Sequence, residues 1–434
     1  MQKLTFVIVL WWVVGLNWKL YQKAHVLPQL SMKKHLDLFH LIAVLLLFIL
    51  PACSSAPQEE PTHKKWYKGN LHTHSYWSDG DEFPEVIMDW YKSHDYQFLA
   101  LSDHNILAEG EKWIDIRPDT LFRLAFESYL KTYGEEWVEY QVDTGQLKVK
   151  LKTLEEYQPL FQEKERFLVL PSEEITDMYE GKHVHLNATN IQELIEPQGG
   201  ESLAATIQNN IDAVIAQRER TGEPIMVHVN HPNFLDAIRL EDMLHLKGER
   251  FFEVYNGHHR VQNEGGIYGL STEAMWDLIN ISYVNEGKPL MFGLATDDAH
   301  NYHRTGKDWS NAGRGWVEVR ADSLTPASLI AAMEAGDFYA STGVSLKQLE
   351  FDDNVLKVGV NAEEGVTYTF SFLAYKKGSD KVEIVLTTEG ESASLELQED
   401  WLFTRCKITS SQLQENPIEN LLYEMAWTQP LQFQ

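Results

Sequence analysis

Short apolar runs alternate with amphipathic segments over the middle of the chain, and this pattern predicts strands alternating with helices. The runs expected to form strands cover 66–71, 96–101, 167–170, 183–187, 224–229, 251–255, 289–295 and 316–319. The helical spacing of apolar positions predicts helices over 84–93, 202–221, 271–284 and 325–335. This βαβα alternation is typical of an α/β fold and argues against an all-β sandwich for this part of the chain.

Two stretches depart from the alternation. Residues 109–165 directly follow the second predicted strand, and they contain an aromatic helix around 121–133, a hairpin turning at 143–145 and a short helix over 154–161. An insertion at this place is expected to lie over the face where strand ends converge, and so to shape a substrate pocket. After about residue 343 short strands separated by turns predominate, which predicts a small, sandwich-like all-β domain over 344–434.

The first 65 residues have the pattern of a secretion signal. Met32 opens a basic stretch, residues 38–50 form an apolar run, and Leu-Pro-Ala-Cys at 50–53 resembles a bacterial lipobox. The run is too short to span a bilayer comfortably. We interpret 1–52 as a signal region with Met32 as the expected start of translation, Cys53 as a lipidated first residue, and 53–65 as a tether. An ordinary cleaved signal, a single-span anchor, and an extra membrane helix within 1–31 are the alternatives.

These segments predict a location in the cell envelope, lipid-anchored on the periplasmic side or the outer-membrane surface. The formal net charge is −27, and without residues 1–52, which hold five basic and one acidic side chain, it becomes −31. Such a surface argues against long nucleic acid as a partner, and it leaves the lipid anchor as the expected membrane contact. A small phosphorylated substrate remains compatible, because bound metal cations would reverse the local field. The second cysteine, Cys406, lies in a predicted strand and is expected to be a buried structural thiol.

Histidine and carboxylate side chains recur close to the ends of the predicted strands. In a βα barrel such positions converge on one face, where the chemistry takes place. Imidazole and carboxylate are the ligands that borderline divalent metals prefer. The set therefore predicts a site for several metal ions, and its members are His72, His74, Asp103, His104, Glu174, His185, His231, Asp298 and His300.

Four of these positions have a rival of the same type close by. The rivals are Glu173, His183, His228 and Asp297. Register with Ile175-Thr176 favours Glu174, the following proline favours His231, and the Asp-x-His spacing favours Asp298. Alternation places His183 and His185 on the same strand face, so spacing leaves that choice open. We expect Asp103 to orient a ligand or a loop from behind the site.

The ordered motifs resemble the PHP (polymerase and histidinol phosphatase) superfamily of metal-dependent phosphoesterases over residues 66–343. The motifs are His72-Thr-His74 with Ser78-Asp79-Gly80, Ser102-Asp103-His104-Asn105, Glu174-Ile-Thr176, His231-Pro232 and Asp298-Ala-His300. The resemblance implies a distorted (β/α)7 barrel that holds two or three divalent metal ions, with Zn, Mn and Fe all compatible. The stretches GRGWVEVRA and FYASTGV, with the terminal β-domain, are similar to a bacterial lipoprotein subgroup of that superfamily.

Carried over residue by residue, the resemblance implies three metal positions. The first would take His72, His74, Glu174 and Asp298; the second would share Glu174 and add His185 and His231; the third would take Asp79, His104 and His300. It further implies attack on a phosphate ester by a metal-bridging hydroxide, with Glu174, Asp298 and His300 as the catalytic residues. His300 is the expected group to protonate the leaving alcohol.

Four further residues are candidates for substrate binding. Arg304 and Arg314 follow the last ligands closely and could clamp a phosphate, or they could be ordinary structural arginines. Asn256 and His258 follow a predicted strand end and could line the pocket. The expected reaction is hydrolysis of a small phosphomonoester or short nucleotide. An amidohydrolase-type enzyme and a non-catalytic surface binding lipoprotein are the alternatives.

Overall fold

A computed structural model describes residues 64–434 apart from 249, 267–268, 419–420 and 433–434, and these belong to one compact unit, His63–Gln434. The predicted signal region, Met32, Cys53 and the tether up to residue 63 lie outside the described residues. Lys64 and Lys65, which end the predicted tether, are described, and Lys65 already begins the first strand of the sheet. Among the described helices, none is long and apolar enough to cross a membrane.

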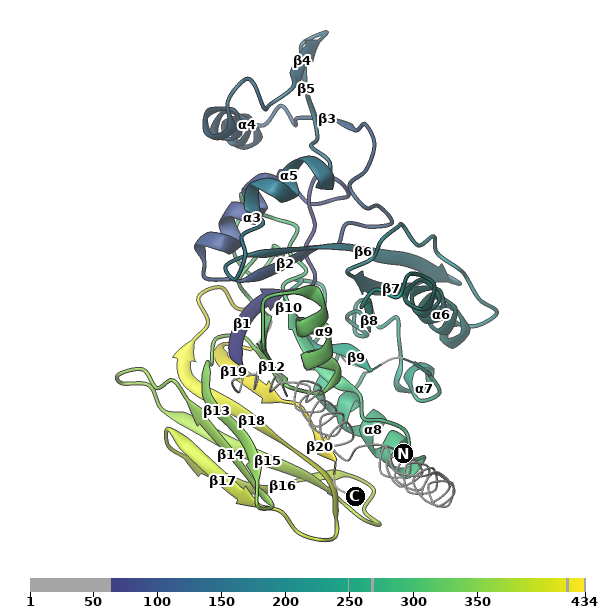
Figure 1. The fold of residues 1–434 in the computed structure, drawn as a ribbon, viewed down its shortest axis with the longest axis vertical. Helices are drawn as coiled ribbons and strands as arrows, with labels where there is room; N and C mark the ends of the chain where they lie inside the picture. The colour runs from purple at the N-terminus through teal and green to yellow at the C-terminus, as the bar shows by residue number, and fades with distance from the viewer. Residues whose placement is uncertain (1–63, 249, 267–268, 419–420, 433–434) are drawn as a thin grey trace, which may run out of the picture. The chain divides into compact units, whose positions relative to one another are not determined.

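Seven strands carry the candidate site, and they lie side by side in one large mixed sheet (Figure 1). The β1–β2, β2–β6, β8–β9 and β9–β10 pairs are parallel, whereas β7 runs antiparallel to both of its neighbours. In sheet order the strands are β1 (Lys65–Asn70), β2 (Phe98–Leu101), β6 (Leu168–Tyr179), β7 (Lys182–Thr189), β8 (Met226–Val229), β9 (Phe251–Asn256) and β10 (Phe292–Thr296).

The chain segments that follow the first and last of these strands meet. Thr73 forms an isolated parallel bridge with Ala299, and the amides of His74 and Asp298 donate to the carbonyls of Ala299 and His72, at 2.9 and 3.0 Å. This contact replaces a continuous ladder between β1 and β10. It brings the two segments richest in predicted ligands together at the carboxyl ends of their strands.

The connection between β6 and β7 is a direct hairpin. β6 is twelve residues long and turns directly into β7 through Glu180 and Gly181, whose φ values are 49° and 82°. Two left-handed residues in a two-residue loop are typical of a tight hairpin turn whose twist matches that of the strands. Glu174 therefore lies inside a long strand and not beyond the end of a short one, as the apolar run 167–170 had suggested.

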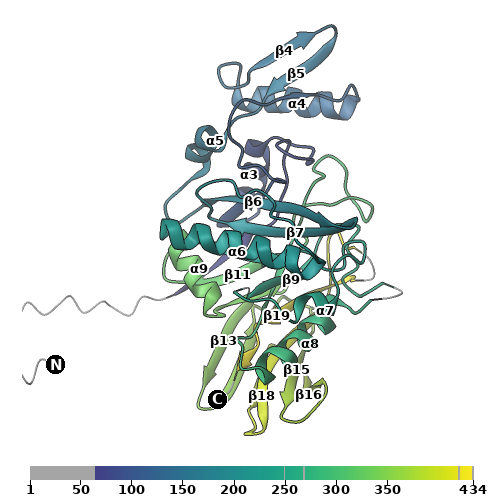
Figure 2. The same ribbon diagram turned by 90° about the vertical axis from the view of Figure 1, so that its right-hand side faces the viewer.

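Five helices follow or connect these strands: α3 (Pro84–Ser93), α6 (Leu203–Thr221), α7 (Leu240–Met243), α8 (Thr272–Asn285) and α9 (Pro326–Glu334). The longest, α6, begins where the Ser202 side chain accepts from the amide of Ala205, and ends at Gly222 with φ of 73°. Figure 2 shows α6 lying across β6 and β7. Its buried face, which includes Ile207, Ile211 and Val214, joins the largest apolar core of the described residues.

The insertion forms the predicted helix α4 (Thr120–Tyr133), the hairpin of β4 (Tyr140–Asp143) and β5 (Gln146–Lys150), and the short helix α5 (Leu154–Phe161). It also contains a short strand that was not predicted, β3 (Trp113–Asp115), which pairs with β5. Its helix α4 is anchored on α3. The rings of Phe83 and Tyr129 stack with centroids 3.9 Å apart, and the Tyr129 hydroxyl donates to the buried carboxylate of Glu85 at 2.8 Å. The insertion is thus fixed to the helix that follows the first ligand-bearing segment.

The C-terminal strands were expected to form a separate domain, but most of them continue the same sheet. β1 pairs with β11 (Trp316–Ala321), β11 with β12 (Phe338–Ser341), and β12 with β19 (Tyr423–Thr428). The remaining strands are β13 (Leu346–Asp352), β14 (Val355–Val360), β15 (Tyr368–Lys376), β16 (Val382–Glu389), β17 (Ser392–Glu396), β18 (Trp401–Leu413) and β20 (Leu431–Gln432). Of these, β13, β14 and β17 form a separate three-stranded sheet, and the others belong to the large sheet. β19 covers the edge that β12 would otherwise expose, so 66–343 and 344–434 form one unit.

Side-chain contacts also join the C-terminal strands to the helices of the main sheet. The guanidinium of Arg405 on β18 is fully buried and donates to Asp277 at 2.8 Å and to Glu273 at 2.9 Å, both on α8. Cys406, the next residue, is buried as predicted. Burial raises the pKa of its thiol, as expected for a structural cysteine.

Candidate metal centre

Four side chains converge on one point at the carboxyl ends of β1 and β10. The Nε2 atoms of His72 and His74 lie 3.1 Å apart, and each lies 3.3 Å from Asp298 Oδ1. Glu174 approaches from β6, with Oε1 3.4 Å from His72 Nε2 and Oε2 3.3 Å from His74 Nε2. All four are buried. Two imidazoles and two carboxylates that point at a common centre are a donor set for a divalent cation.

The backbone on each side holds these ligands in place. Asp298 has a φ of 48°, a left-handed conformation that is uncommon for a residue other than glycine. Its amide hydrogen bond to the His72 carbonyl fixes that conformation and turns the Asp298 carboxylate toward the two histidines. Strained backbone of this kind persists where the surrounding structure over-determines it, and it is often found at functional sites.

A second group surrounds Glu174 from the other side. His185 Nδ1 lies 3.0 Å and His231 Nε2 3.4 Å from Glu174 Oε1, and His231 Nε2 is 3.7 Å from Asp298 Oδ2. The other ring nitrogen of His185, Nε2, is buried and has no hydrogen-bond partner among the described residues. A buried polar atom left without a partner is costly, and a bound cation would satisfy it.

A third group lies at the solvent side of the centre. Asp79 Oδ1 is 3.2 Å from His300 Nε2, 3.5 Å from His104 Nε2 and 3.8 Å from His74 Nδ1. The His74 and His300 rings stack with their centroids 4.1 Å apart. The Asp79 side chain is 59% exposed, so this end of the centre is open to a substrate.

The structure brings all nine predicted ligands together; of the four rivals, backbone amides engage Glu173 and Asp297, whereas His183 and His228 lie close to the ligands. Glu173 accepts from the Ile195 amide, Asp297 accepts from the amides of 313–315, and His228 contacts Glu253. His183 lies beside His185 at a ring distance of 5.4 Å but belongs to none of the convergent groups among the described residues. Position alone thus favours the predicted member of each pair, and ligation itself remains a prediction.

Asp103 has the supporting position expected for it. Its carboxylate accepts from the Ser75 amide at 2.8 Å, from the Ser75 hydroxyl at 2.7 Å and from the Ser78 hydroxyl at 2.5 Å. These bonds hold the loop that carries His74 and Asp79.

Burial and charge act in opposite directions on the two central carboxylates. Burial raises the pKa of Glu174, but His104, His185 and His72 outweigh it and hold that pKa well below its usual range. The pKa of Asp298 is likewise lowered, because His72, His74 and other histidines outweigh burial. Both groups are therefore anionic at neutral pH, as cation ligands must be.

The histidines divide into two kinds. Burial and the neighbouring His300 and His104 together lower the pKa of His74 to about 4, so its ring is neutral and offers a lone pair. Burial also lowers the pKa of His104, but Glu174 and Asp79 outweigh burial and raise it to about 11. A cation at this position would compensate the same two carboxylates and replace that proton.

The four predicted substrate-binding residues occupy different places. Arg304 is partly exposed, lies 3.4 Å from Asp119 of the insertion and faces the Phe122 and Trp309 rings. His258 lies at the centre, with its ring 5.2 Å from that of His300, and burial lowers its pKa to about 2.

Arg314 and Asn256 differ from the expectation. The Arg314 guanidinium is buried, and all three of its nitrogens donate to Gly257, Gly306, Trp309, Asn311 and Asn416, so its donors are already occupied and it cannot clamp a phosphate in this arrangement. Asn256 is fully buried behind the centre, where its amide donates to Asp298 Oδ2 at 3.1 Å and to Glu253 Oε2 at 2.8 Å. It supports a ligand and does not line a pocket.

Three residues near the ligands were missed by the sequence reasoning. Asn230, next to His231, donates to Glu174 Oε1 at 2.7 Å. The ring of Phe234 lies 5.1 to 6.1 Å from those of His231, His183, His258 and His185, and it is partly exposed. Glu253 is fully buried in the strand run FFEVYN, where an acid among apolar residues was a readable signal of a polar role.

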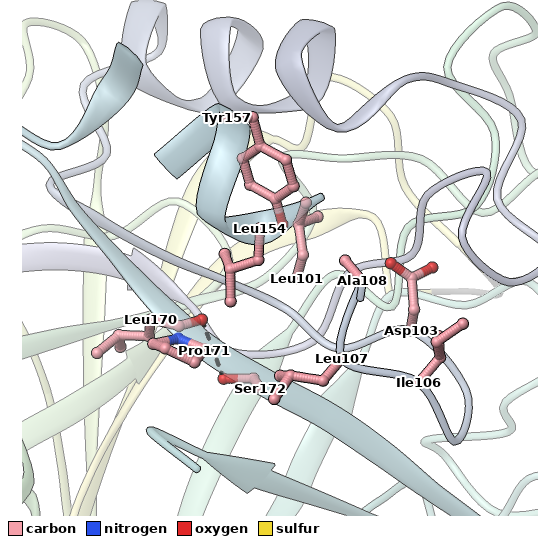
Figure 3. A pocket seen from close by; sticks show the side chains of 10 residues that line it. All are labelled: Leu101, Asp103, Ile106, Leu107, Ala108, Leu154, Tyr157, Leu170, Pro171 and Ser172. Atoms are coloured by element: carbon pink, nitrogen blue, oxygen red, sulfur yellow. Dashed lines mark hydrogen bonds between the residues drawn. The ribbon is translucent and has the colours of Figure 1, made fainter. Parts of the chain in front are cut away.

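A small cavity lies between α5, the segment that follows β2 and the first part of β6 (Figure 3). Asp103, Leu101 and Ser172 line it together with mostly apolar neighbours, and its volume is about 10 Å³. That is roughly the space of a single water molecule. It is therefore too small to hold a substrate.

No protein-family model matches this chain, and a search of curated proteins finds no relative. Several solved structures are similar. One is a two-domain protein from Bacteroides vulgatus described as containing a predicted PHP-like metal-dependent phosphoesterase, with 12% identity and a TM-score of 0.36, over 85% of this chain and 96% of that one.

Two further solved structures each match over 56% of this chain and 90% of their own. A candidate metal-dependent phosphoesterase from Bifidobacterium adolescentis has 14% identity and a TM-score of 0.25. An amidohydrolase from Chromobacterium violaceum, solved with bound sulfate and without metal, has 12% identity and a TM-score of 0.26. All three likenesses are distant, so functional conclusions rest on this chain's own side chains.

Proposed function

We propose that this protein is a metal-dependent phosphoesterase that hydrolyses a small phosphomonoester or short nucleotide at a centre of two or three divalent ions. One observation carries the proposal: the convergent ligand groups share members. Glu174 belongs with His72 and His231 and also with His104 and His185, while His74 belongs with His72 and Asp298 and also with Asp79, His104 and His300. Adjacent sites that share a carboxylate are typical of multinuclear hydrolases.

The ligand assignment is the one that the resemblance to the PHP superfamily implies, and the convergent groups overlap with it without matching it ion by ion. His72, His74, Glu174 and Asp298 would hold the first ion, Glu174 with His185 and His231 the second, and Asp79, His104 and His300 the third. The mixture of imidazole and carboxylate donors suits Zn, Mn and Fe alike. When bound, such ions supply an acidified water and neutralise the charge on phosphoryl oxygens.

The chain itself supplies orientation and a proton. His300 Nδ1 lies 2.9 Å from the Asp298 carbonyl oxygen, to which it donates, and this directs Nε2 toward Asp79 at the open end of the centre. Burial lowers the pKa of His300, but Asp79 and Asp298 outweigh it and raise that pKa, which favours the protonated ring. With the third position vacant, His300 is placed to pass this proton to the leaving oxygen.

The walls of the open end fit a small substrate. Phe234 and His258 offer a partly exposed ring and a neutral imidazole beside the ligands, and Arg304 stands on the neighbouring loop with Asp119 as its partner. The strongly negative net charge disfavours long nucleic acid. A small phosphate ester needs only the cations and local donors.

We also propose that the strands around the centre form the barrel expected for the PHP superfamily. The seven strands from β1 to β10, with the bridge between Thr73 and Ala299, would be the distorted barrel of the PHP superfamily, closed by one contact. The motifs at His72-Thr-His74 and Asp298-Ala-His300 support this, since they form both halves of the closing contact. The hairpin between β6 and β7 would be its main distortion.

We further propose that the protein is anchored in the cell envelope through a lipid on Cys53, and that this is its contact with the membrane. The support is the basic stretch, short apolar run and lipobox-like Leu-Pro-Ala-Cys before a polar tether. Expression of the full chain in a bacterium with radiolabelled palmitate should label the protein, and Cys53→Ala should abolish labelling. Equal labelling of both would overturn the anchor.

The function is tested on the purified full chain by elemental analysis and by turnover of p-nitrophenyl phosphate and bis-p-nitrophenyl phosphate with added Mn or Zn. We expect two to three ions per chain and turnover that His74→Ala and Asp298→Asn abolish. Activity on amides or lactones but on neither phosphate would favour an amidohydrolase-type enzyme. A folded protein without bound metal would favour a non-catalytic binding protein.

A further inference from the structure

Behind the candidate metal centre, on β9, lies a carboxylate that points at the backs of its ligands. Glu253 is fully buried, and five donors surround its two oxygens. His72 Nδ1 at 2.7 Å, Thr296 Oγ1 at 2.8 Å and His228 Nε2 at 3.3 Å approach Oε1. The amide of His231 and Asn256 Nδ2, both at 2.8 Å, donate to Oε2. A carboxylate has about four lone-pair sites, so this one is fully used.

These donors lead to three ligands of the proposed centre. His72 is held directly through its Nδ1, which leaves Nε2 as the atom that faces His74 and Asp298. His231 is held through its own backbone amide. Asp298 is held through Asn256, whose single amide group donates both to Glu253 Oε2 and to Asp298 Oδ2. One side chain thus fixes ligands of two neighbouring metal positions.

The surroundings of Glu253 also argue against a role as a metal ligand. His72, His228 and Glu253 lie close enough together to hold an ion. However, N–H and O–H donors already occupy both oxygens, whereas a cation would need those lone pairs free. The geometry therefore suits a carboxylate that orients histidines, and not one that binds metal.

We propose that Glu253 is the positioning residue of the metal centre, setting the orientation of His72 and His231 so that the first and second ions bind together. The inference rests on the proposed function only in taking these residues as metal ligands. It requires no particular substrate, so metal affinity tests it even if phosphate esters prove not to be substrates. Loss of the group that hydrogen-bonds a histidine ligand from behind typically weakens metal binding by about 10- to 100-fold.

The decisive variant is Glu253→Gln in the full chain. Glutamine keeps the size of the side chain, but only its oxygen accepts hydrogen bonds, because its NH2 group is a donor. That NH2 group would therefore face either the donor of His72 or the donors of His231 and Asn256, and the hydrogen bonds on that side would be lost. The matched control is Glu173→Gln. Glu173 is an equally buried acid on β6, but its hydrogen bond is to the Ile195 amide, away from the ligands.

The measurement is the dissociation constant for Zn or Mn, obtained by titration calorimetry on folded protein, with near-UV circular dichroism as the check on folding. We expect Glu253→Gln to weaken binding by roughly 10- to 100-fold and Glu173→Gln to bind as the unchanged protein does. Co²⁺ absorption should also shift in Glu253→Gln, since the His72 ring is no longer held. A folded Glu253→Gln with unchanged affinity, or an equal loss in Glu173→Gln, would overturn the proposal.

A second variant covers the case in which Glu253→Gln does not fold. Thr296→Val has nearly the same shape and removes one donor to Glu253 without touching a ligand. We expect it to weaken metal binding by about 3- to 10-fold, a fraction of the full effect. Unchanged affinity in this variant would count against the proposal.

Discussion

The side chains of His72 and His74 end with their Nε2 atoms 3.1 Å apart. Both rings also face Asp298 Oδ1 at 3.3 Å. Two nitrogens that both face a carboxylate and each other satisfy all three contacts best when a cation lies between them. We therefore expect a bound ion at this point of the centre.

Metal removal should lower the thermal stability of the full chain. An ion that binds only the folded state adds about 2.7 kcal/mol at a free concentration 100 times its dissociation constant. We expect chelation to lower the midpoint of thermal unfolding by several degrees and added Zn or Mn to restore it. His74→Ala should abolish this response, whereas His245→Ala, an exposed histidine outside the convergent groups, should keep it. A response that survives in His74→Ala would contradict the assignment.

The two arginines near the centre should differ in what they affect. Arg314 is buried with all its nitrogens donating, so Arg314→Ala should lower the free energy of unfolding by about 3 kcal/mol. Arg304 is exposed on the rim, so Arg304→Ala should leave stability unchanged and raise KM for a phosphate ester roughly tenfold if the side chain contacts substrate. Urea unfolding and steady-state kinetics measure the two effects. The reverse pattern would contradict both roles.

Phe234 should set how tightly the substrate binds. Its partly exposed ring lies beside His231, His185 and His258, where the non-reacting part of a substrate would pass. Phe234→Ala removes apolar contact area, and we expect KM to rise roughly tenfold with kcat little changed. Phe234→Leu keeps most of that area, so its KM should lie between those of the unchanged protein and of Phe234→Ala. If Phe234→Ala instead lowers the metal content, the ring supports the ligands and not the substrate.

Glu82 should make stability depend on pH. Burial raises its pKa to about 8, and the neighbouring Asp81 and Glu85 contribute to the rise, against the lowering effect of the Phe83 amide. Between its ordinary pKa and 8 the folded chain therefore holds a proton that the unfolded chain releases. The free energy of unfolding should fall as pH rises through this window, by at most about 1.4 kcal/mol per pH unit.

Glu82→Gln removes that titration. Its stability relative to the unchanged protein should therefore increase from pH 5 to pH 8, with the two nearly equal at the acidic end. Urea unfolding at both pH values measures the difference. A gap that does not widen with pH would show that Glu82 titrates normally in the folded chain.

Local patterns along the chain were enough to predict most elements and the members of the candidate site. The helix expected over 84–93 has those bounds, and the insertion contains the predicted helix, hairpin and short helix. The strand-end pattern identified eight of the nine predicted ligands that converge in the fold, and the ninth, Asp79, came from the family resemblance. Such features depend on hydrophobic periodicity, capping residues and residue spacing, and all three can be recognised from residues that are close together in the sequence.

Only the tertiary structure decided which partners these elements have. The pairing of β12 with β19 joined the expected separate domain to the main sheet, and a tight hairpin at Glu180 and Gly181 joined the strand of Glu174 directly to that of His185. Distant backbone carbonyls, Asn416 among them, gave Arg314 a structural role, and contacts with β1, β8 and β10 gave Glu253 its place behind the ligands. The physical reason is that hydrogen-bond satisfaction of a buried group depends on residues far away in the sequence, and only the folded chain brings them together.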